Sequence, residues 1–375
     1  MTAKTITVDL GERSYPIIIG AGVLKNAAQY LHPHLTGSRL AIITDETVAD
    51  LHLAALQDAL ADLSDIHIET IILPPGEATK SFAVLEGVVD QLLAKNFSRS
   101  DTLLAFGGGV IGDLTGFAAS ILKRGCHFIQ MPTTLLAQVD SAVGGKTAIN
   151  TKGGKNLVGQ FYQPQAVLSD CDVLGTLPIR QMKAGYGEVL KYALINDPAF
   201  FTWLLTHGTD VIACDADALS HTIAICCRAK AEIVRQDERE HGVRALLNLG
   251  HSFAHALEGK AGYDGSLLHG EAVTAGMLMA FEFSRDQDMC SPKDVRTLAD
   301  HLCALELCDI NTLPPAILSD PAHLMSFMMR DKKNTNGALN LILTHGVGKA
   351  FQAFDVHQKD VLHYLTHISE ISGDR

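Results

Sequence analysis

The sequence predicts an α/β domain over residues 1–178, followed by a mainly α-helical domain over residues 179–375. In the first half, short β-rich runs alternate with segments of helical spacing, which is typical of a parallel sheet covered by helices. From about Ile179 onward, helical patterns dominate. Between the two halves, the stretch "GTLP" carries turn residues and ends at Pro178, which indicates a domain boundary.

The strands expected in the first half are continuous apolar runs, which fits a sheet buried on both faces. The first is "RLAIITD", residues 39–45, and regularly spaced Leu and Ala predict a helix over 47–63. In chain order, the remaining elements are strand 66–73, helix 81–95, strand 101–106, helix 110–122, and strands 127–132 and 166–170.

The second half is expected to be helical apart from one strand, "ALNLIL", residues 338–343. A cleft between the two domains is the expected place for a ligand, because ligands prefer such clefts. The helices predicted from apolar spacing are 179–194, 216–236, 246–260, 269–287, 292–305 and 321–329.

Composition excludes several classes of function. The 375 residues carry a formal net charge of −12, which argues against partners such as nucleic acid or an anionic membrane. We see no signal-peptide pattern and no apolar window long enough to span a bilayer. The 8 cysteines show no CxxC spacing, so free thiols in a reducing, cytoplasmic location are expected.

A glycine-rich loop offers a dinucleotide site. "LLAFGGGVIGDLTG" contains G-x-G-x-x-G at Gly107, Gly109 and Gly112, after an apolar strand and at the start of a helix. Such loops let backbone amides approach a pyrophosphate. The loop follows a middle strand, however, and no Asp or Glu lies about 20 residues further on, so the candidate acid for a ribose is upstream, at Asp45. A tight strand-to-helix turn, with Asp113 as an acid of the first helical turn, remains an alternative.

A polar region over residues 131–164 is basic within an acidic protein, which indicates an anionic small-molecule ligand. A solvated glycine-rich loop explains it equally well. The stretch "PPGEATK" places Glu77 and Lys80 three residues apart, as in a surface ion pair. The cationic and amide side chains of the basic region are Lys146, Lys152, Lys155 and Asn156.

Three features of the second half suggest a metal site. Glu188 and Lys191 lie three residues apart on a predicted helix, His251 and His255 lie four apart in "LNLGHSFAHALE", and His269 precedes another helix. A catalytic zinc takes three ligands from His and carboxylate groups and keeps one open position. Two well-packed helix histidines are the alternative reading of the pair.

Further cations stand near these features. Arg244 and Asn248 precede His251 by seven and three residues, and they share its face if the helix starts early. Solvated surface charge is the simpler reading of Lys230 and of the turn "DKKNTNG", which contains Lys332 and Lys333.

The ordered series of motifs resembles the 3-dehydroquinate synthases. The resemblance extends from about Asp45 to "DKK", most of the chain. More distant relatives are the other sugar-phosphate cyclases and the glycerol and iron-type alcohol dehydrogenases. The motifs that carry it are "GGGVIGDLTGFAAS", "PTTLLAQVDSAVGGKTAIN", "GKNLVGQFYQP", "GEVLKYA", "LNLGHSFAHALE", "HGEAV" and "DKK".

The resemblance implies a phosphate-eliminating carbon–oxygen lyase of the shikimate pathway. Its substrate would be 3-deoxy-D-arabino-heptulosonate 7-phosphate (DAHP), and its products 3-dehydroquinate and phosphate. NAD would be used and regenerated in each turnover, and a divalent metal, usually zinc but also cobalt, would hold the substrate. Arg124 is similar to an arginine that reaches the neighbouring subunit's site, which implies a homodimer.

The family roles fall on matching positions of this sequence. The metal ligands would be Glu188, His251 and His269, which also face the substrate. Cofactor contacts would be Asp45, Glu77, Lys80, Gly108, Gly109, Asp113, Thr133, Thr134, Asp140, Ser141, Lys155, Thr176 and Leu177. Substrate contacts would be Arg124, Asp140, Lys146, Asn156, Lys191, Lys230, Arg244, Asn248, His255, Lys332 and Lys333. Catalytic roles would fall to Lys146, His255, Lys191, Arg124 and Asn248.

Departures from the family are slight: Gly187 stands where Ala is usual, and Ala193 where Gly is common. Three other functions remain open: a sugar-phosphate cyclase for a neutral substrate, a metal-dependent polyol dehydrogenase, and a non-enzymatic binding module. Arg244 and Lys230 favour a carboxylated substrate over a neutral one. The lysine-rich region 146–156 favours a phosphorylated substrate over a simple polyol.

Overall fold

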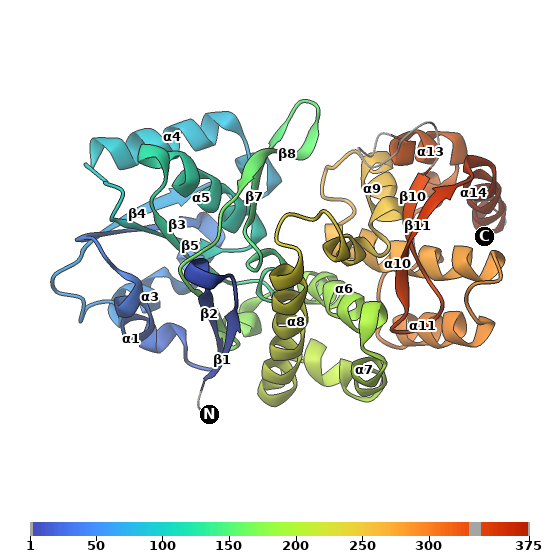
Figure 1. The fold of residues 1–375 in the computed structure, drawn as a ribbon, viewed down its shortest axis with the longest axis horizontal. Helices are drawn as coiled ribbons and strands as arrows, with labels where there is room; N and C mark the ends of the chain where they lie inside the picture. Colours follow the sequence, from blue (N-terminus) through green and yellow to red (C-terminus); the bar gives the residue numbers. More distant parts are fainter. Residues whose placement is uncertain (1–2, 330–338, 374–375) are drawn as a thin grey trace. The chain divides into compact units, whose positions relative to one another are not determined.

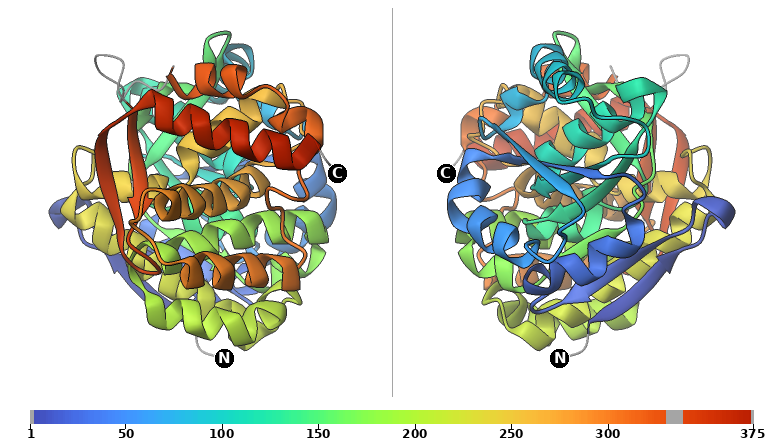
Figure 2. Two further views of the ribbon diagram at one scale, coloured as in Figure 1. Left: turned by 90° about the vertical axis from the view of Figure 1, so that its right-hand side faces the viewer. Right: turned by 90° about the vertical axis from the view of Figure 1, so that its left-hand side faces the viewer.

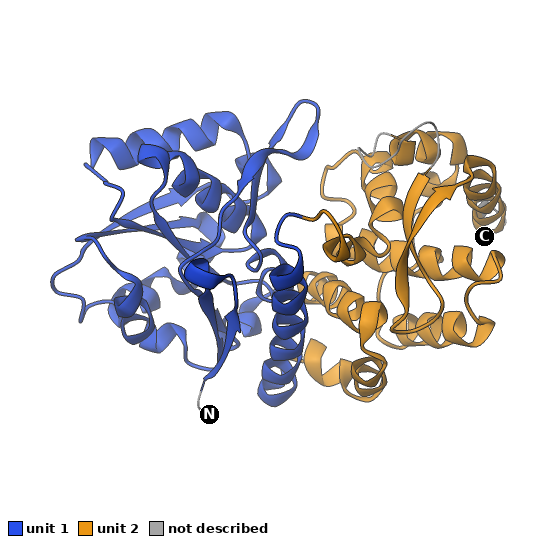
Figure 3. Ribbon diagram, in the orientation of Figure 1, with its two compact units in different colours: residues 1–178, 214–239 blue, residues 179–213, 240–375 orange. Residues whose placement is uncertain are grey.

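The structure is a computed structural model that describes residues 3–329 and 339–373. The chain forms two compact units, coloured separately in Figure 3. Unit 1 consists of Met1–Pro178 and Cys214–Arg239, and unit 2 of Ile179–Ala213 and Glu240–Arg375.

Unit 1 takes back one helix from the second half of the chain. Helix α8, Ala216–Gln236, packs against strands β1 and β2, which the sequence patterns did not predict. The expectation that 179–375 is one continuous domain is therefore corrected for residues 214–239. The physical reason is that the apolar face of α8 needs a partner, and the β1–β2 hairpin supplies it.

Unit 1 is built on a seven-stranded sheet with the order β1-β2-β9-β6-β5-β3-β4. All neighbouring pairs are parallel except β1 with β2. The strands are β1 Lys4–Val8, β2 Tyr15–Gly20, β3 Arg39–Asp45, β4 His67–Leu73, β5 Thr102–Gly107, β6 His127–Pro132 and β9 Val167–Asp170. The predicted parallel α/β fold is confirmed.

Helices cover both faces of this sheet, with α4 and α5 on one face and α1 and α3 on the other (Figure 1). In β3, Ala41 and Ile43 point to the α4–α5 side, whereas Leu40 and Ile42 point the other way, and all four are buried. This double burial explains the continuous apolar runs. The helices are α1 Ala27–Leu31, α3 Ala54–Ala59, α4 Phe82–Ala94 and α5 Gly109–Ile121. The helix predicted over 47–63 is broken into α2 Glu46–Val48, a π-helical turn Ala49–Leu53 and α3.

The strand order places the glycine loop at a switch point of the sheet. From β3 the chain first adds β4 on one side, then returns to add β5 on the other. The carboxyl ends of β3 and β5 therefore meet at a topological switch point, the place where open α/β sheets bind ligands. In this strand order, the switch point lies after β5, so a ligand-binding glycine loop is expected after this middle strand rather than after the first one.

The polar region contains a hairpin that projects from unit 1 (Figure 1). Strands β7, Lys146–Thr151, and β8, Gly154–Phe161, pair antiparallel. The stretch that could also be read as a solvated loop thus contains a hairpin.

Unit 2 is mainly helical, as predicted. The hairpin β10–β11 lies beside α10, and α14 lies beside α13 (Figure 2, left). The sequence predicted β10 but missed α7, α12, β11 and α14. The elements are α6 Ile179–Asn196, α7 Pro198–Ile212, α9 His251–Lys260, α10 His269–Asp286, α11 Pro292–Ala304, α12 Pro315–Leu318, α13 Pro321–Met329, β10 Leu339–Thr344, β11 Ala350–Val356 and α14 Gln358–Gly373. Within the described residues, no helix is both long and apolar enough to cross a membrane.

The helix predicted over 246–260 begins later than expected. Arg244 and Asn248 lie in a separate 3₁₀ helix, Val243–Asn248, and α9 begins at His251. Gly250 separates the two with φ of 78°, a left-handed conformation that interrupts helical geometry. A Cβ on Gly276 of α10 would meet the Gly250 carbonyl oxygen at 2.3 Å, so these glycines let α9 and α10 touch.

A buried histidine makes the stability of unit 2 dependent on pH. His301 of α11 is buried, its Nε2 lies 3.0 Å from the hydroxyl of Tyr186 in α6, and burial lowers the pKa of His301 from 6.5 to about 4. The unfolded chain therefore takes up this proton first as pH falls. The stabilisation is present above pH 6.5 and is lost towards pH 4, by at most about 3 kcal/mol.

We therefore expect His301→Gln, which keeps a partner for Tyr186 but does not titrate, to flatten the pH dependence. The measurement is the free energy of unfolding in urea at pH 7.0, 5.5 and 4.0 for both proteins. Equal slopes for the two proteins between pH 6.5 and 4 would contradict this role of His301.

Candidate metal and cofactor sites

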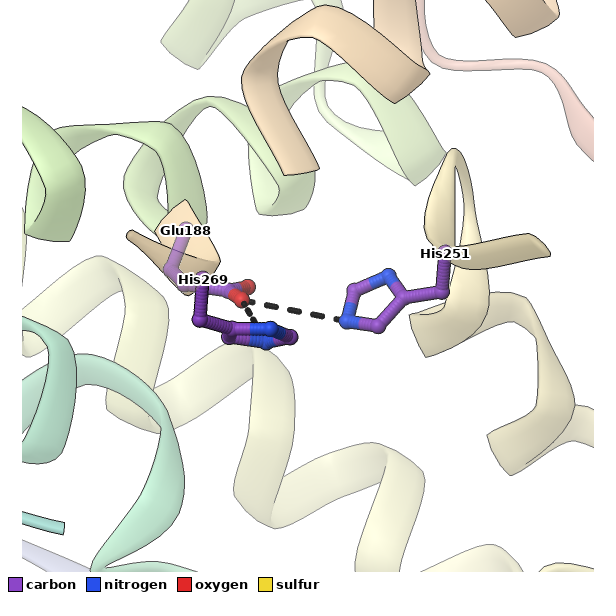
Figure 4. A group of neighbouring side chains, drawn as sticks. All are labelled: Glu188, His251 and His269. Carbon is purple, nitrogen blue, oxygen red and sulfur yellow. Dashed lines mark ion pairs between the residues drawn. The ribbon is translucent and has the colours of Figure 1, made fainter. Parts of the chain in front are cut away.

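The three predicted metal ligands converge within unit 2. Glu188 lies in the middle of α6, and His251 and His269 are the first residues of α9 and α10. Their side chains point toward one another (Figure 4). The Glu188 Oε1 atom lies 3.8 Å from Nε2 of His251 and 3.5 Å from Nε2 of His269. One ligand atom from each residue lies within 4.8 Å of the others.

These residues fit a divalent metal ion such as zinc. Ligands bound at about 2.1 Å in tetrahedral geometry lie about 3.4 Å apart, close to the separations above. The donor set, two imidazoles and one carboxylate, is that of a catalytic site that keeps one position for water or substrate. Glu188 is fully buried, and a carboxylate is buried at such a place only with a cation or hydrogen bonds to compensate it.

Hydrogen bonds select the nitrogen that each histidine offers. Nδ1 of His251 lies 3.2 Å from the carbonyl oxygen of Leu249, and Nδ1 of His269 lies 3.1 Å from Oε2 of Glu258. Since both partners accept hydrogen bonds, Nδ1 of each ring carries the proton. Nε2 of each ring is then left to face Glu188.

The protonation of the two histidines differs. Burial lowers the pKa of His251 to about 3, against the attraction of Glu188, so this ring is neutral. Burial also disfavours the charged form of His269, but hydrogen bonds to Glu188 and Glu258 outweigh it and raise its pKa to about 10. A metal ion bound here would displace a proton from His269, because a metal binds the neutral imidazole.

Close helix packing holds the three ligands together. A Cβ on Gly270 would meet the carbonyl oxygen of Ala184 at 1.9 Å, so only glycine lets α10 approach α6 at this point. A Cβ on Gly187 would meet the hydroxyl oxygen of Thr274 at 2.3 Å. Glycine at position 187, where the family usually has Ala, thus leaves room for the side chain of Thr274.

Two other predicted residues of unit 2, Lys191 and His255, lie beside this centre. The Lys191 Nζ atom lies 2.5 Å from Glu188 Oε2, and both side chains are buried. His255 is exposed, with its ring centroid 5.7 Å from that of His251 and 6.4 Å from that of His269. Arg244 is only 1% exposed.

Asn248 has a partner that sequence reasoning missed. Its Nδ2 donates to Oε1 of Glu240 over 2.7 Å. No periodic pattern links these residues, because the chain between them is irregular up to the 3₁₀ helix. The predicted residues Lys332 and Lys333 lie outside the described residues.

The predicted cofactor residues of unit 1 gather at the carboxyl edge of its sheet. Asp45 ends β3, Gly108 and Gly109 follow β5, and Thr133 and Thr134 follow β6. A Cβ on Gly108 would lie 3.1 Å from Cγ2 of Thr134, and one on Gly109 would lie 3.0 Å from Oγ of Ser141. Further from the loop, Oγ1 of Thr176, which precedes Leu177, lies 2.9 Å from Nε2 of His52.

A hydrogen-bonded network links this edge to the β7–β8 hairpin. Buried Lys80 donates to Asp113 over 2.6 Å and to Asn156 over 2.5 Å. Burial raises the pKa of Asp113, and the Lys80 ammonium partly offsets this. Asn150, which sequence reasoning missed, donates to Glu77 over 2.7 Å and accepts from the Asn156 amide. The surface pair suggested for Glu77 and Lys80 is thus not formed as such; each has its own partner in this network.

Two other predicted residues of unit 1, Lys230 and Asp140, form an ion pair. Lys230 of α8 is buried, and its Nζ lies 2.9 Å from Oδ1 of Asp140, so a solvated surface charge is the wrong reading of Lys230. Arg124 is exposed in a short 3₁₀ turn with φ of 71°. Lys146 opens β7 and is exposed, and Lys155 lies in β8.

Known proteins resemble the chain along nearly its whole length. The N-terminal family model of 3-dehydroquinate synthase matches residues 70–184, and the C-terminal one matches residues 185–334. The chain is 53% identical to the 3-dehydroquinate synthase of Rhodospirillum rubrum over 351 residues, which are 93% of this chain and 91% of that protein.

Solved structures with 26–28% identity share the fold. One is a 2-epi-5-epi-valiolone synthase from Streptomyces hygroscopicus subsp. jinggangensis with NAD+ and Zn2+ bound, with a TM-score of 0.87 over 97% of this chain and 99% of that one. Another is 2-deoxy-scyllo-inosose synthase complexed with carbaglucose-6-phosphate, NAD+ and Co2+, with a TM-score of 0.85 over the same shares. The family matches and the identity to curated relatives confirm the resemblance predicted from the motifs: the chain belongs to the 3-dehydroquinate synthase family.

Proposed function

We propose that the chain converts DAHP to 3-dehydroquinate and phosphate, as a phosphate-eliminating lyase of the shikimate pathway. The reaction proceeds by oxidation, phosphate elimination, reduction, ring opening and aldol closure, without net redox change. The observation that carries the proposal is the 53% identity to a 3-dehydroquinate synthase over 93% of the chain. The grouping of Glu188, His251 and His269 agrees with it.

We propose that unit 1 binds NAD and that unit 2 binds zinc or cobalt. The edge formed by the carboxyl ends of β3, β5 and β6 supports the first part, and the donor set at Glu188 supports the second. The proposed NAD contacts are Asp45, Glu77, Lys80, Gly108, Gly109, Asp113, Thr133, Thr134, Asp140, Ser141, Lys155, Thr176 and Leu177.

When bound, the metal would polarise hydroxyl oxygens of the substrate, and NAD would accept a hydride and later return it. The chain's own residues orient the substrate and handle charge. Lys191, buried against Glu188, would donate to a substrate oxygen at the metal centre. Exposed His255 would contact the phosphate or move a proton, and Asn248 would fix a hydroxyl group.

The remaining substrate contacts are cationic, as a phosphorylated carboxylate requires. Arg244 and Lys230 would serve the carboxylate, and this choice favours DAHP over a neutral sugar phosphate. Lys146, Asn156, Asp140 and the lysines at 332 and 333 complete the proposed set. Arg124 would act on the site of a second copy in a homodimer, and we propose a cytoplasmic location for the enzyme.

A second candidate is a cyclase for a neutral sugar phosphate, favoured by the likeness to valiolone and inosose synthases. Their 26–28% identity is about half of that to the 3-dehydroquinate synthase, which places them second.

The test is incubation of the purified chain with DAHP, a catalytic amount of NAD and zinc, while phosphate release and 3-dehydroquinate are followed. We expect phosphate and 3-dehydroquinate in equal amounts, without accumulation of NADH. A parallel reaction with glycerol and excess NAD is the control for a dehydrogenase. Steady NADH formation with glycerol and no phosphate from DAHP would overturn the proposal, and turnover of a neutral sugar phosphate alone would favour the second candidate.

A further inference from the structure

A buried carboxylate behind the metal ligands has no role so far. Glu258 lies in the last turn of α9 and is 3% exposed. His251, His255 and Glu258 stand at positions i, i+4 and i+7, so they form one stripe along the helix. The Oε2 atom of Glu258 lies 3.1 Å from Nδ1 of His269, across the contact between α9 and α10.

The position of Glu258 is unfavourable for the helix that carries it. The last turn of a helix is its negative end, where a carboxylate is repelled, and burial adds a desolvation cost. Nor does Glu258 cap α10, because the side chain of Glu271 accepts from the Leu268 amide at the start of that helix. The contact with His269 compensates the charge of a carboxylate at this position.

We propose that Glu258 is a positioning residue for the metal centre. Its carboxylate accepts the Nδ1 hydrogen of His269 and thereby fixes the ring with Nε2 toward Glu188 and His251. The proposal rests on the proposed function, because it takes these three residues as metal ligands. For His251 a backbone carbonyl, that of Leu249, makes the equivalent contact, so Glu258 is the member of this pair that a mutation can test.

The experiment compares the parent protein with Glu258→Ala, Glu258→Gln and a matched control, Glu282→Gln. Glu282 is a half-buried carboxylate of α10 whose Oε2 lies 2.9 Å from the Tyr364 hydroxyl, and it is not a member of the metal cluster. The metal-free forms are titrated with zinc in competition with a chromogenic chelator. The visible absorption of the Co2+-loaded forms and the urea unfolding of the metal-free forms are measured beside it.

We expect Glu258→Ala to weaken zinc binding by about 10- to 100-fold, as is usual when the partner of a metal-bound histidine is removed. Glu258→Gln keeps an acceptor oxygen but loses the charge, so it should fall between Ala and the parent. Both should change the Co2+ absorption bands, whereas Glu282→Gln should leave the zinc affinity and these bands as in the parent. If Glu258→Ala fails to fold, the Gln variant alone decides the matter.

Parent-like zinc affinity and Co2+ spectra in the folded Glu258 variants would overturn the proposal, even if their free energy of unfolding were lower. That result would mean that Glu258 only stabilises the fold. If the parent protein itself bound neither metal, the proposed function would fail and this proposal with it. Normal metal binding and turnover in the parent, with unchanged binding in the variants, would remove the role of Glu258 alone.

Discussion

His251→Ala is expected to abolish both zinc binding and turnover. The substitution removes one of three ligands that lie within 4.8 Å of one another, and a site of two ligands holds a divalent ion poorly. Because a metal contributes several kcal/mol to such chemistry, phosphate release should fall by at least about a thousandfold. The measurements are zinc content by mass spectrometry and phosphate release from DAHP.

The neighbouring histidine makes this experiment sharper. His255 lies one helical turn from His251, is exposed, and is not a member of the metal cluster. His255→Ala should therefore retain zinc but lose turnover, and His323→Ala, at an exposed histidine of α13, should change neither. Full zinc content and activity in His251→Ala would refute the assignment of that ligand.

The strands and helices that the sequence predicted well are those with a strong apolar pattern. The predicted ranges 39–45 and 127–132 coincide with β3 and β6, and α8 begins and ends as expected. Buried strands of a parallel sheet and long amphipathic helices leave such patterns because one or both of their faces must leave water. Of the four strands in the hairpins β1–β2 and β10–β11, only β10 was predicted. Strands β1 and β11 are largely exposed or half-buried and leave weak patterns, whereas β2 is almost entirely buried and its apolar run was missed.

The sequence predicted neither the order of the strands in the sheet nor the packing of α8 in unit 1. Parallel strands pair through backbone hydrogen bonds that carry no side-chain signature, so the chain order says little about neighbours. The position of β5 beside β3 is known only from the assembled sheet. It explains why a glycine loop that follows a middle strand, not the first one, still lies where a ligand is expected.

For the metal centre, spacing alone left the histidines of "LNLGHSFAHALE" open, and the family resemblance selected the three ligands that the structure brings together. What sequence reasoning missed are partners held by distant contacts. Asn150 and Glu77 are 73 residues apart, and their hydrogen bond depends on how the hairpin lies on the sheet. The sequence could have indicated Glu258, because it stands two turns after His251 on the same helix face.

Arg244→Leu is expected to weaken binding of DAHP rather than to stop catalysis once the substrate is bound. The side chain is 1% exposed and lies in unit 2, which also holds the metal cluster. A hydrogen-bonded charge pair with a substrate carboxylate contributes about 1.5–3 kcal/mol, so KM should rise by about 10- to 100-fold with a smaller change in kcat. Arg244→Lys should recover only part of the loss, because an ammonium lacks the planar fork that binds a carboxylate bidentately.

The identity of the group that Arg244 binds follows from changing the ligand as well as the protein. An analogue of DAHP with a hydroxymethyl group in place of the carboxylate should bind the parent and Arg244→Leu equally weakly, because the interaction is then missing on one side already. Arg296→Leu, at an exposed arginine of α11, should bind both ligands as the parent does. An unchanged KM in Arg244→Leu, or an equal loss for both ligands, would assign the carboxylate to another residue. The choice between DAHP and a neutral sugar phosphate would then depend on Lys230, whose ammonium already faces Asp140.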